Sequence, residues 1–178
     1  QPSRSAAAIV LAVAAALEAV VREHALVKGS MMLVDPEKQG GLLKRLDVYP
    51  LKLRSGVSAA NTMVTIAQSG GSGFYAGKVA RDTNGEFYRQ DLLDSGIHFD
   101  VCPAPLSGPP TGSCIVLTTP DAERTMCTNL GVSTGLARSD MDADQIAQSK
   151  YIYVEGYLWD AEHPRAASVE AQAQTRRA

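Results

Sequence analysis

The fold of this chain is decided by the stretch Ser55-Gly56-Val57-Ser58-Ala59-Ala60-Asn61-Thr62. Its small residues predict a turn that leads into a helix beginning near Ser58, and a glycine at position 56 lets a ligand approach the backbone closely. The first amides of that helix have no partner within the helix, and the Asn61 carboxamide can both donate and accept hydrogen bonds. This set of donors and acceptors suits a sugar-like hydroxyl. It includes no group that could activate a phosphate or abstract a proton.

Composition predicts one globular domain that binds a small molecule. The chain has 178 residues, of which 45% are hydrophobic and 20% are charged, so it can bury a core of ordinary size. The net charge is -2, and the lysines and arginines are scattered along the sequence. Scattered basic residues give no electrostatic reason to expect a nucleic acid or a membrane as partner.

Cysteine and histidine usage predicts neither a disulfide framework nor a metal site. The three cysteines are Cys102, Cys114 and Cys127. Their number is odd and no CxxC spacing occurs, while the three histidines are isolated from one another and from acidic ligand patterns. We therefore expect no bound metal and a reducing, cytoplasmic location.

The N-terminal region contains an alanine-rich apolar run from residue 6 to residue 21. It follows Arg4, so it has the general layout of a signal peptide, but Glu18 interrupts the run. It is also shorter than the roughly 20 apolar residues that a membrane-spanning helix needs. A buried or partly buried helix is the favoured interpretation, and a signal peptide is the alternative.

Periodicity and turn residues predict alternating strands and helices. The expected helices span residues 36–46, 58–68, 84–93, 140–148 and 164–175. The expected strands span residues 31–34, 74–79, 98–101, 113–119, 124–128 and 151–155. Antiparallel hairpins are expected between residues 97 and 128, where Pro and Gly turns separate the strands. The pattern predicts an α/β fold with a mostly parallel sheet, flanking helices and a small antiparallel sheet, all in a single domain over residues 1–178.

Two glycine motifs imitate nucleotide-binding loops. Residues 71–76, Gly-Ser-Gly-Phe-Tyr-Ala, fit the dinucleotide fingerprint, and Gly77-Lys78 resembles the end of a phosphate loop. The fingerprint should follow a strand and open a helix, whereas here it follows a helix and opens a strand. A phosphate loop also needs Ser or Thr where Val79 stands. A dinucleotide-dependent enzyme is therefore the weakest of the hypotheses.

Acidic residues offer two candidate sites. Asp82, Glu86 and Asp91 could form a carboxylate site, but Arg81 and Arg89 are close enough to pair with them, so a solvated helix face is the favoured interpretation.

Glu155 differs from these residues because it ends the apolar run 151–155 and precedes a glycine. In open α/β sheets the carboxyl ends of strands line the ligand crevice. For Glu155 a ligand-binding role and a structural role both stay open.

Several further motifs resemble the same protein family as the stretch 55–62. They are Lys28-Gly29-Ser30-Met31, Gly77-Lys78-Val79 with Asp82 and Gly85, Pro110-Thr111-Gly112, Thr119-Pro120-Asp121-Ala122, Arg124-Thr125-Met126, Leu130-Gly131 and Tyr157-Leu158-Trp159-Asp160. Together they resemble the N-terminal half of the ribokinase-like (PfkB) family, and most closely its bacterial adenosine-kinase-like branch. The resemblance runs from about residue 26 to residue 160.

This resemblance implies a partial ribokinase-like fold whose antiparallel β lid closes over a sugar or nucleoside. The lid would be contributed by about residues 29–36, 50–56 and 97–130. By resemblance the enzyme is a phosphotransferase that phosphorylates a substrate hydroxyl with ATP and Mg²⁺. Asn61 matches the family asparagine that binds sugar hydroxyls, and Gly56 matches the first glycine of a hinge pair. Val57 replaces the second glycine, and a β-branched residue there would stiffen the hinge.

Two departures from the family pattern limit the expected activity. The family opens with Gly-x-Gly-Asn-Ala-x-x-Asp, whose Asp grips the substrate, and Ala19 stands at that position here. The Gly-Ala-Gly-Asp motif of the C-terminal, ATP-binding half, which supplies the catalytic base, does not occur in the sequence.

We therefore expect the substrate-side portion of a sugar or nucleoside kinase, truncated and inactive by itself. Its substrate-binding residues would be Gly56, Asn61 and Glu155. The alternative is a non-catalytic module derived from that fold, which binds a ligand or self-associates through exposed sheet edges.

Overall fold

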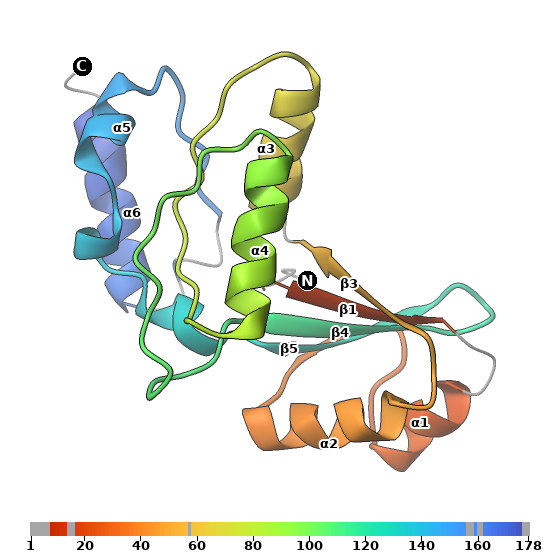
Figure 1. The fold of residues 1–178 in the computed structure, drawn as a ribbon. Coiled ribbons are helices and arrows are strands. Elements are labelled where there is room, and N and C mark those ends of the chain that lie inside the picture. Colours follow the sequence, from red (N-terminus) through yellow and green to blue (C-terminus); the bar gives the residue numbers. More distant parts are fainter. Residues whose placement is uncertain (1–7, 14–16, 57, 156–158, 160–161, 176–178) are drawn as a thin grey trace.

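The computed structural model describes residues 8–13, 17–56, 58–155, 159 and 162–175 (Figure 1). Its centre is a five-stranded sheet in the order β2-β5-β4-β1-β3. The strands are β1 (Ala8–Val13), β2 (Met31–Leu33), β3 (Leu51–Ser55), β4 (Ser113–Thr118) and β5 (Arg124–Asn129). β1 pairs in parallel with β4, and β2 pairs in parallel with β5. β1 with β3 and β4 with β5 are antiparallel, so the sheet is mixed and does not show the predicted predominance of parallel pairs.

Helices lie on both sides of this sheet, which confirms the predicted α/β class. They are α1 (Leu17–Glu23), α2 (Pro36–Leu46), α3 (Ser58–Gln68), α4 (Thr83–Asp94), α5 (Ala143–Gln148) and α6 (Glu162–Thr175), with short 3-10 helices at Gly131–Gly135 and Arg138–Asp140. In Figure 1, α1 and α2 cover one face of the sheet, while α3 to α6 gather on the opposite side. No helix of the described residues is both long and apolar enough to cross a membrane.

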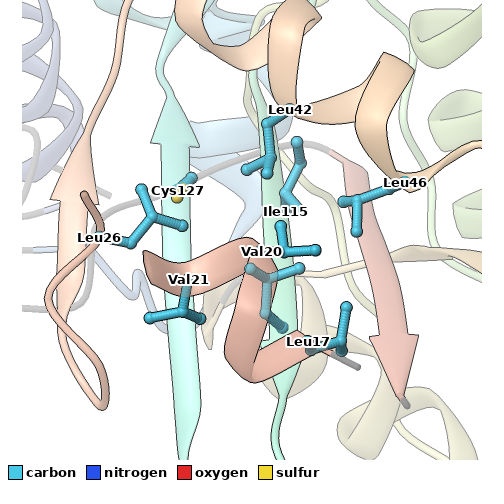
Figure 2. Close-up of a cluster of buried hydrophobic side chains, with 9 residues drawn as sticks. Leu17, Val20, Val21, Leu26, Leu42, Leu46, Ile115 and Cys127 are labelled. Atoms are coloured by element: carbon cyan, nitrogen blue, oxygen red, sulfur yellow. The ribbon is translucent and has the colours of Figure 1, made fainter. Parts of the chain in front are cut away.

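One hydrophobic core lies between the sheet and the helix pair α1 and α2. Figure 2 shows its side chains pointing toward one another from the two helices and from β4 and β5. Its fully buried members include Leu17, Val20, Leu46, Ile115 and Leu117. Each such side chain contributes about 1.5 to 3 kcal/mol when it is removed from water, so this core anchors the sheet.

A second core lies on the other side of the sheet, around α3 and α4. Ala60 of α3 packs with Tyr88 and Leu92 of α4, and Val79, Ile97 and Phe99 complete the cluster. The Tyr88 and Phe99 rings meet edge to face, with 5.9 Å between their centroids. This aromatic core supports the part of the molecule that carries the predicted substrate residues.

The alanine-rich N-terminal run forms a strand followed by a helix, so the prediction of a helix from residue 6 is wrong for residues 8–13. These residues form β1, which pairs with β3 on one edge and with β4 on the other. Pairing on both edges satisfies the backbone groups of the strand, and this outweighs the helix propensity of alanine. Only the later part of the run, from Leu17, is helical.

Three of the predicted strands do not form regular strands. Segments 74–79 and 98–101 lie side by side in parallel but are bridged only at Phe74–His98 and Ala80–Ala104. Residues 98–101 therefore do not belong to the antiparallel hairpin, which consists of β4 and β5 alone. Segment 151–155 forms no strand at all. A strand exists only where a neighbour supplies hydrogen bonds, and an apolar run cannot reveal whether that neighbour is present.

Candidate functional site

The start of α3 holds the carboxylate of Glu155. The Ser58 hydroxyl, at the first residue of α3, donates a hydrogen bond to Glu155 Oε2 at 2.9 Å. Glu155 is buried, with an exposed fraction of 8%. The N-terminus of a helix carries a partial positive charge that stabilises a nearby anion. The small side chains of the β3–α3 turn thus create a place for a buried carboxylate.

The second oxygen of this carboxylate has no hydrogen-bond partner. Glu155 Oε1 is buried and accepts no hydrogen bond from the described residues, and the same is true of Ser55 Oγ and the Tyr88 hydroxyl. Leaving a buried polar group unsatisfied costs about 1 to 3 kcal/mol, and more when the group is charged. A ligand that donates a hydroxyl to Glu155 Oε1 would remove that cost.

Aromatic side chains pack against α3 in the second core. The Tyr75 ring lies 6.0 Å from Tyr88 and 5.3 Å from Phe99, measured between centroids. Burial is the main cause that raises the pKa of both tyrosines, and the negative charge of Glu155 adds to the effect. Burial therefore disfavours the ionised form of both phenols.

The other two predicted substrate residues lie on the same β3–α3 unit. Gly56 is buried directly after β3. Asn61 is exposed, and its carboxamide makes no hydrogen bond to a described residue. Because Asn61 follows Ser58 by three positions, the two side chains are neighbours on one face of α3. The structure thus places Asn61 and Ser58 on the same helix, one turn apart, whereas Val57 lies outside the described residues.

Sequence reasoning missed the link between Ser58 and Glu155 and the buried hydroxyls of Ser55 and Tyr88. The Ser58–Glu155 contact joins residues 97 positions apart, so no local pattern could reveal it. Ala19, where the family pattern places a substrate-binding Asp, lies in α1 on the opposite side of the sheet from α3 (Figure 1).

Asp82 has a structural role. Its carboxylate caps α4 by accepting from the Gly85 amide at 2.8 Å, and it also accepts from the Thr111 amide and hydroxyl at 2.8 and 2.6 Å. Burial alone would raise the pKa of Asp82, but the hydrogen bonds from Thr111 and Gly85 outweigh it and lower the pKa. The described ion pairs do not include the expected partners Arg81 and Arg89.

Other motif residues also connect separate elements of the fold. Lys28 forms ion pairs with Glu18 and Asp121, which ties α1 to the β4–β5 turn. Gly131 has φ +52°, and a Cβ there would lie 2.1 Å from the Pro110 carbonyl oxygen. These motif residues therefore stabilise the fold.

The glycines at 71–76 do not form a nucleotide loop, because they lie in coil after α3 and no helix opens directly behind them. Among the described residues, no group of three or more His, Cys, Asp or Glu side chains could hold a metal ion.

Comparison with known proteins identifies the family. Residues 51–178 match the family described as pfkB family carbohydrate kinase. The chain belongs to the pfkB family. This confirms the resemblance drawn from the sequence motifs. Of the last motif group, residues 157–160, only Trp159 lies within the described residues.

Solved structures of pfkB kinases superpose closely on the chain. An adenosine kinase from Sinorhizobium meliloti is 35% identical, with a TM-score of 0.85 over 96% of this chain and 51% of that enzyme. A probable sugar kinase from Rhizobium etli is 32% identical, with a TM-score of 0.83 and the same two coverages, 96% and 51%. The adenosine kinase of Trypanosoma brucei brucei, at 19% identity and a TM-score of 0.80, is similar in fold over 99% of this chain and 56% of its own.

The chain spans about half the length of these solved relatives. A comparison with curated protein sequences gives no match. Family membership and the ribokinase-like α/β fold are therefore shown by the pfkB match and by the superposed kinases.

Proposed function

We propose that this chain is the substrate-side portion of an ATP-dependent kinase that phosphorylates a hydroxyl of a sugar or nucleoside. Membership of the pfkB family supports a phosphotransferase that acts on an alcohol group. Two of the most similar structures belong to an adenosine kinase and a probable sugar kinase, which supports either a nucleoside or a sugar as the substrate.

The unpartnered oxygen of Glu155 carries this proposal. In it, Glu155 Oε1 accepts a hydrogen bond from a substrate hydroxyl, while Ser58 holds the other carboxylate oxygen in place. The exposed Asn61 carboxamide binds a second hydroxyl, and the absence of a side chain at Gly56 leaves room for the substrate against the backbone. A buried carboxylate that lacks a donor is the feature that a polyol satisfies best.

We also propose that the 178-residue chain does not transfer phosphate by itself. Phosphoryl transfer depends on groups that cradle the phosphates, on Mg²⁺ and on a base that activates the hydroxyl. The described residues contain no candidate site for the metal, and the whole sequence contains no Gly-Ala-Gly-Asp motif. In this proposal the chain binds the acceptor, works in the cytoplasm, and contacts neither nucleic acid nor membrane.

Calorimetric titration of the chain with adenosine and, separately, with ribose tests the site. We expect saturable binding of one of the two, and at least a tenfold weaker affinity after Glu155→Gln, which removes the carboxylate charge but keeps the size of the side chain. Glu37→Gln is the matched control, because Glu37 is exposed in the first turn of α2 and should leave the affinity unchanged. Equal affinities of wild type and Glu155→Gln would refute the assignment of Glu155.

The alternative function is a non-catalytic association module. It is favoured by the exposed apolar residues of segment 151–155. Absence of saturable binding to both ligands, together with concentration-dependent association in sedimentation, would favour this alternative over the kinase portion.

A further inference from the structure

One asparagine of this chain, Asn84, is followed by a glycine. The side-chain amide of an asparagine can be attacked by the backbone nitrogen of the next residue, and glycine has no side chain that would hinder the approach. The other asparagines, Asn61 and Asn129, are followed by a threonine and a leucine, whose side chains hinder it. The pair at positions 84–85 is therefore the part of the sequence most susceptible to spontaneous deamidation.

The fold holds the attacking nitrogen of this pair in an unreactive form. Asn84 and Gly85 lie in the first turn of α4, behind the capping residue Asp82. Asp82 Oδ1 accepts a hydrogen bond from the Gly85 amide at 2.8 Å. The nitrogen can attack only after it has lost its proton, and a carboxylate that accepts a hydrogen bond from this N–H favours the protonated nitrogen. Asp82 thus opposes the first step of the reaction.

Thr111 holds the Asp82 carboxylate in this position. Its hydroxyl donates to Asp82 Oδ1 at 2.6 Å, and its amide donates to Asp82 Oδ2 at 2.8 Å. Burial alone would raise the pKa of Asp82, but the hydrogen bonds from Thr111 and Gly85 outweigh it and lower the pKa. The carboxylate therefore stays ionised and keeps its hydrogen bond to the Gly85 amide.

The backbone around Gly85 also opposes the reaction. The product ring joins Asn84 Cγ to the Gly85 nitrogen, so the Cα–C bond of Asn84 must rotate out of the helical range. Gly85 is buried, and a Cβ there would lie 2.1 Å from the Ala80 carbonyl oxygen. The Asn84 side chain, in contrast, is half-buried and forms no hydrogen bond with the described residues. Protection therefore depends on the folded turn and on Asp82.

We propose that Asn84 is a latent deamidation site, which the hydrogen bond from the Gly85 amide to Asp82 keeps closed. When the first turn of α4 opens, the Gly85 nitrogen loses its proton, attacks Asn84 Cγ and displaces the side-chain nitrogen as ammonia. The resulting succinimide adds water at one of its two carbonyl carbons, which gives aspartate or isoaspartate at position 84. The reaction needs only water, and it is independent of the proposed substrate site.

Isoaspartate at position 84 would prevent the turn from closing again. It adds a carbon atom to the backbone directly before Gly85, where the packing against Ala80 leaves no room for a methyl group. α4 also carries Tyr88 and Leu92 of the second core. Deamidation is therefore an irreversible step that damages this core, and the modified chain should unfold at a lower urea concentration than the unmodified chain.

Peptide mapping of the aged 178-residue chain tests the proposal. The chain is incubated at mildly alkaline pH and digested with trypsin, and the peptide of residues 82–89, which contains no other asparagine or glutamine, is analysed by mass spectrometry. Labelling with a protein isoaspartate methyltransferase measures the isoaspartate fraction. We expect the folded wild-type chain to deamidate at least tenfold more slowly than the same chain unfolded in urea, because only the open turn reacts.

Substitution of Asp82 tests its part in this protection. Asp82→Ala should accelerate deamidation of the folded chain at least fivefold, when each rate is divided by that of the same variant unfolded in urea. Asp82→Ser keeps an acceptor oxygen at the cap position and should restore most of the protection. Thr111→Val keeps the carboxylate but removes a hydroxyl that holds it, and should accelerate the reaction at least twofold.

The matched control is Asp35→Ala. Asp35 caps α2 by accepting a hydrogen bond from the Lys38 amide at 2.7 Å, so this substitution removes an equivalent cap far from Asn84 in the sequence. The rate at Asn84 should stay at the wild-type value. Circular dichroism of each variant verifies that it is folded under the conditions of incubation.

Three results would overturn the proposal. One is an equal rate of deamidation in the folded and the unfolded wild-type chain. Another is a wild-type rate in both Asp82→Ala and Thr111→Val. The third is equal acceleration by Asp35→Ala and Asp82→Ala, which would assign the protection to overall stability instead of to Asp82. None of these measurements depends on a bound sugar or nucleoside, so this inference and the proposed function can fail separately.

Discussion

At the scale of single residues, the Ser58 hydroxyl holds one oxygen of Glu155 and leaves the other buried without a donor. One oxygen of this carboxylate contributes to the stability of the fold, and the other is available to a ligand in our proposal. The hydrogen bond and the helix N-terminus stabilise the carboxylate, whereas the unsatisfied oxygen costs free energy until a ligand arrives. Of the two roles that its sequence position left open for Glu155, the hydrogen bond from Ser58 supports the structural one, and the ligand-binding one is our proposal.

Substitution of Ser58 tests the structural role. Ser58→Ala removes the donor to Glu155 Oε2, and we expect the free energy of unfolding to fall by about 1 to 3 kcal/mol. Ser58→Thr keeps a hydroxyl and should restore most of that loss. Thermal or urea denaturation measures the difference. Ser69→Ala, which removes an exposed hydroxyl at the end of α3, is the control, and an equal loss in both alanine variants would contradict the expectation.

The ion pair of Lys28 and Asp121 makes stability depend on pH. The hydrogen bond from Lys28, followed by that from Thr119, lowers the pKa of Asp121 from 3.8 to about 2. A lowered pKa in the folded state stabilises the fold above the ordinary pKa, and this contribution is lost as the pH falls from about 4 to about 2. We expect Asp121→Asn to be less stable than wild type at neutral pH and the two to converge near pH 2. A constant difference in urea denaturation across that range would disprove the assignment.

At the scale of secondary-structure elements, hydrogen bonds and ion pairs between side chains hold neighbouring elements together. Asp82 ties the N-terminus of α4 to Thr111, which precedes β4, and Lys28 ties α1 to the β4–β5 turn. The hydrogen bonds of Asp82 require the backbones of the connected segments to approach closely. A Cβ at Gly85 would lie 2.1 Å from the Ala80 carbonyl oxygen and 2.8 Å from Thr111 Oγ1. Packing around the hydrogen bonds of Asp82 therefore requires a glycine at position 85.

Two glycine substitutions should act in opposite directions. Gly85→Ala forces the backbone of residue 80 away from α4, so we expect a loss of about 1 to 3 kcal/mol. Gly41→Ala lies inside α2 with nothing within 4 Å of the new Cβ, so it should stabilise the chain by about 0.5 to 1 kcal/mol. Denaturation midpoints of the two variants measure both effects. Destabilisation by Gly41→Ala, or an unchanged midpoint for Gly85→Ala, would count against this account.

At the scale of the whole molecule, two cores with different tasks lie on opposite sides of the sheet. The core of α1, α2 and the sheet is aliphatic and stabilises the fold (Figure 2). The core around α3 and α4 is rich in aromatic rings and holds α3, whose first residue binds Glu155. The proposed binding functions therefore gather on one side of the molecule, opposite α1 and α2 (Figure 1).

The proposed function predicts that the chain binds its substrate without phosphorylating it. With ATP, Mg²⁺ and either adenosine or ribose, the purified chain should form no ADP above the rate of a sample without protein, because in our proposal the described residues supply neither the phosphate-binding groups nor the base. A coupled assay for ADP measures this. Substrate-dependent ADP formation that disappears in Glu155→Gln would show instead that the chain is a working kinase.

The amino-acid sequence by itself determined the elements that carry their own local signals, and it determined the family. α2 begins at Pro36 behind a capping Asp35, α4 begins behind a capping Asp82, and the hairpin of β4 and β5 surrounds a Pro-Asp turn. Each depends on contacts a few residues apart, which a sequence displays directly. The sequence motifs likewise specify the pfkB family.

Only the tertiary structure decided the features that depend on distant partners. Pairing with β3 and β4 turned residues 8–13 into a strand against their local preference, whereas residues 151–155 form no strand and Tyr151 and Tyr153 are exposed. The hydrogen bond between Ser58 and Glu155 spans 97 positions. Hydrogen bonds and burial stabilise a segment only when another part of the fold supplies the second group, and a linear pattern does not contain that information.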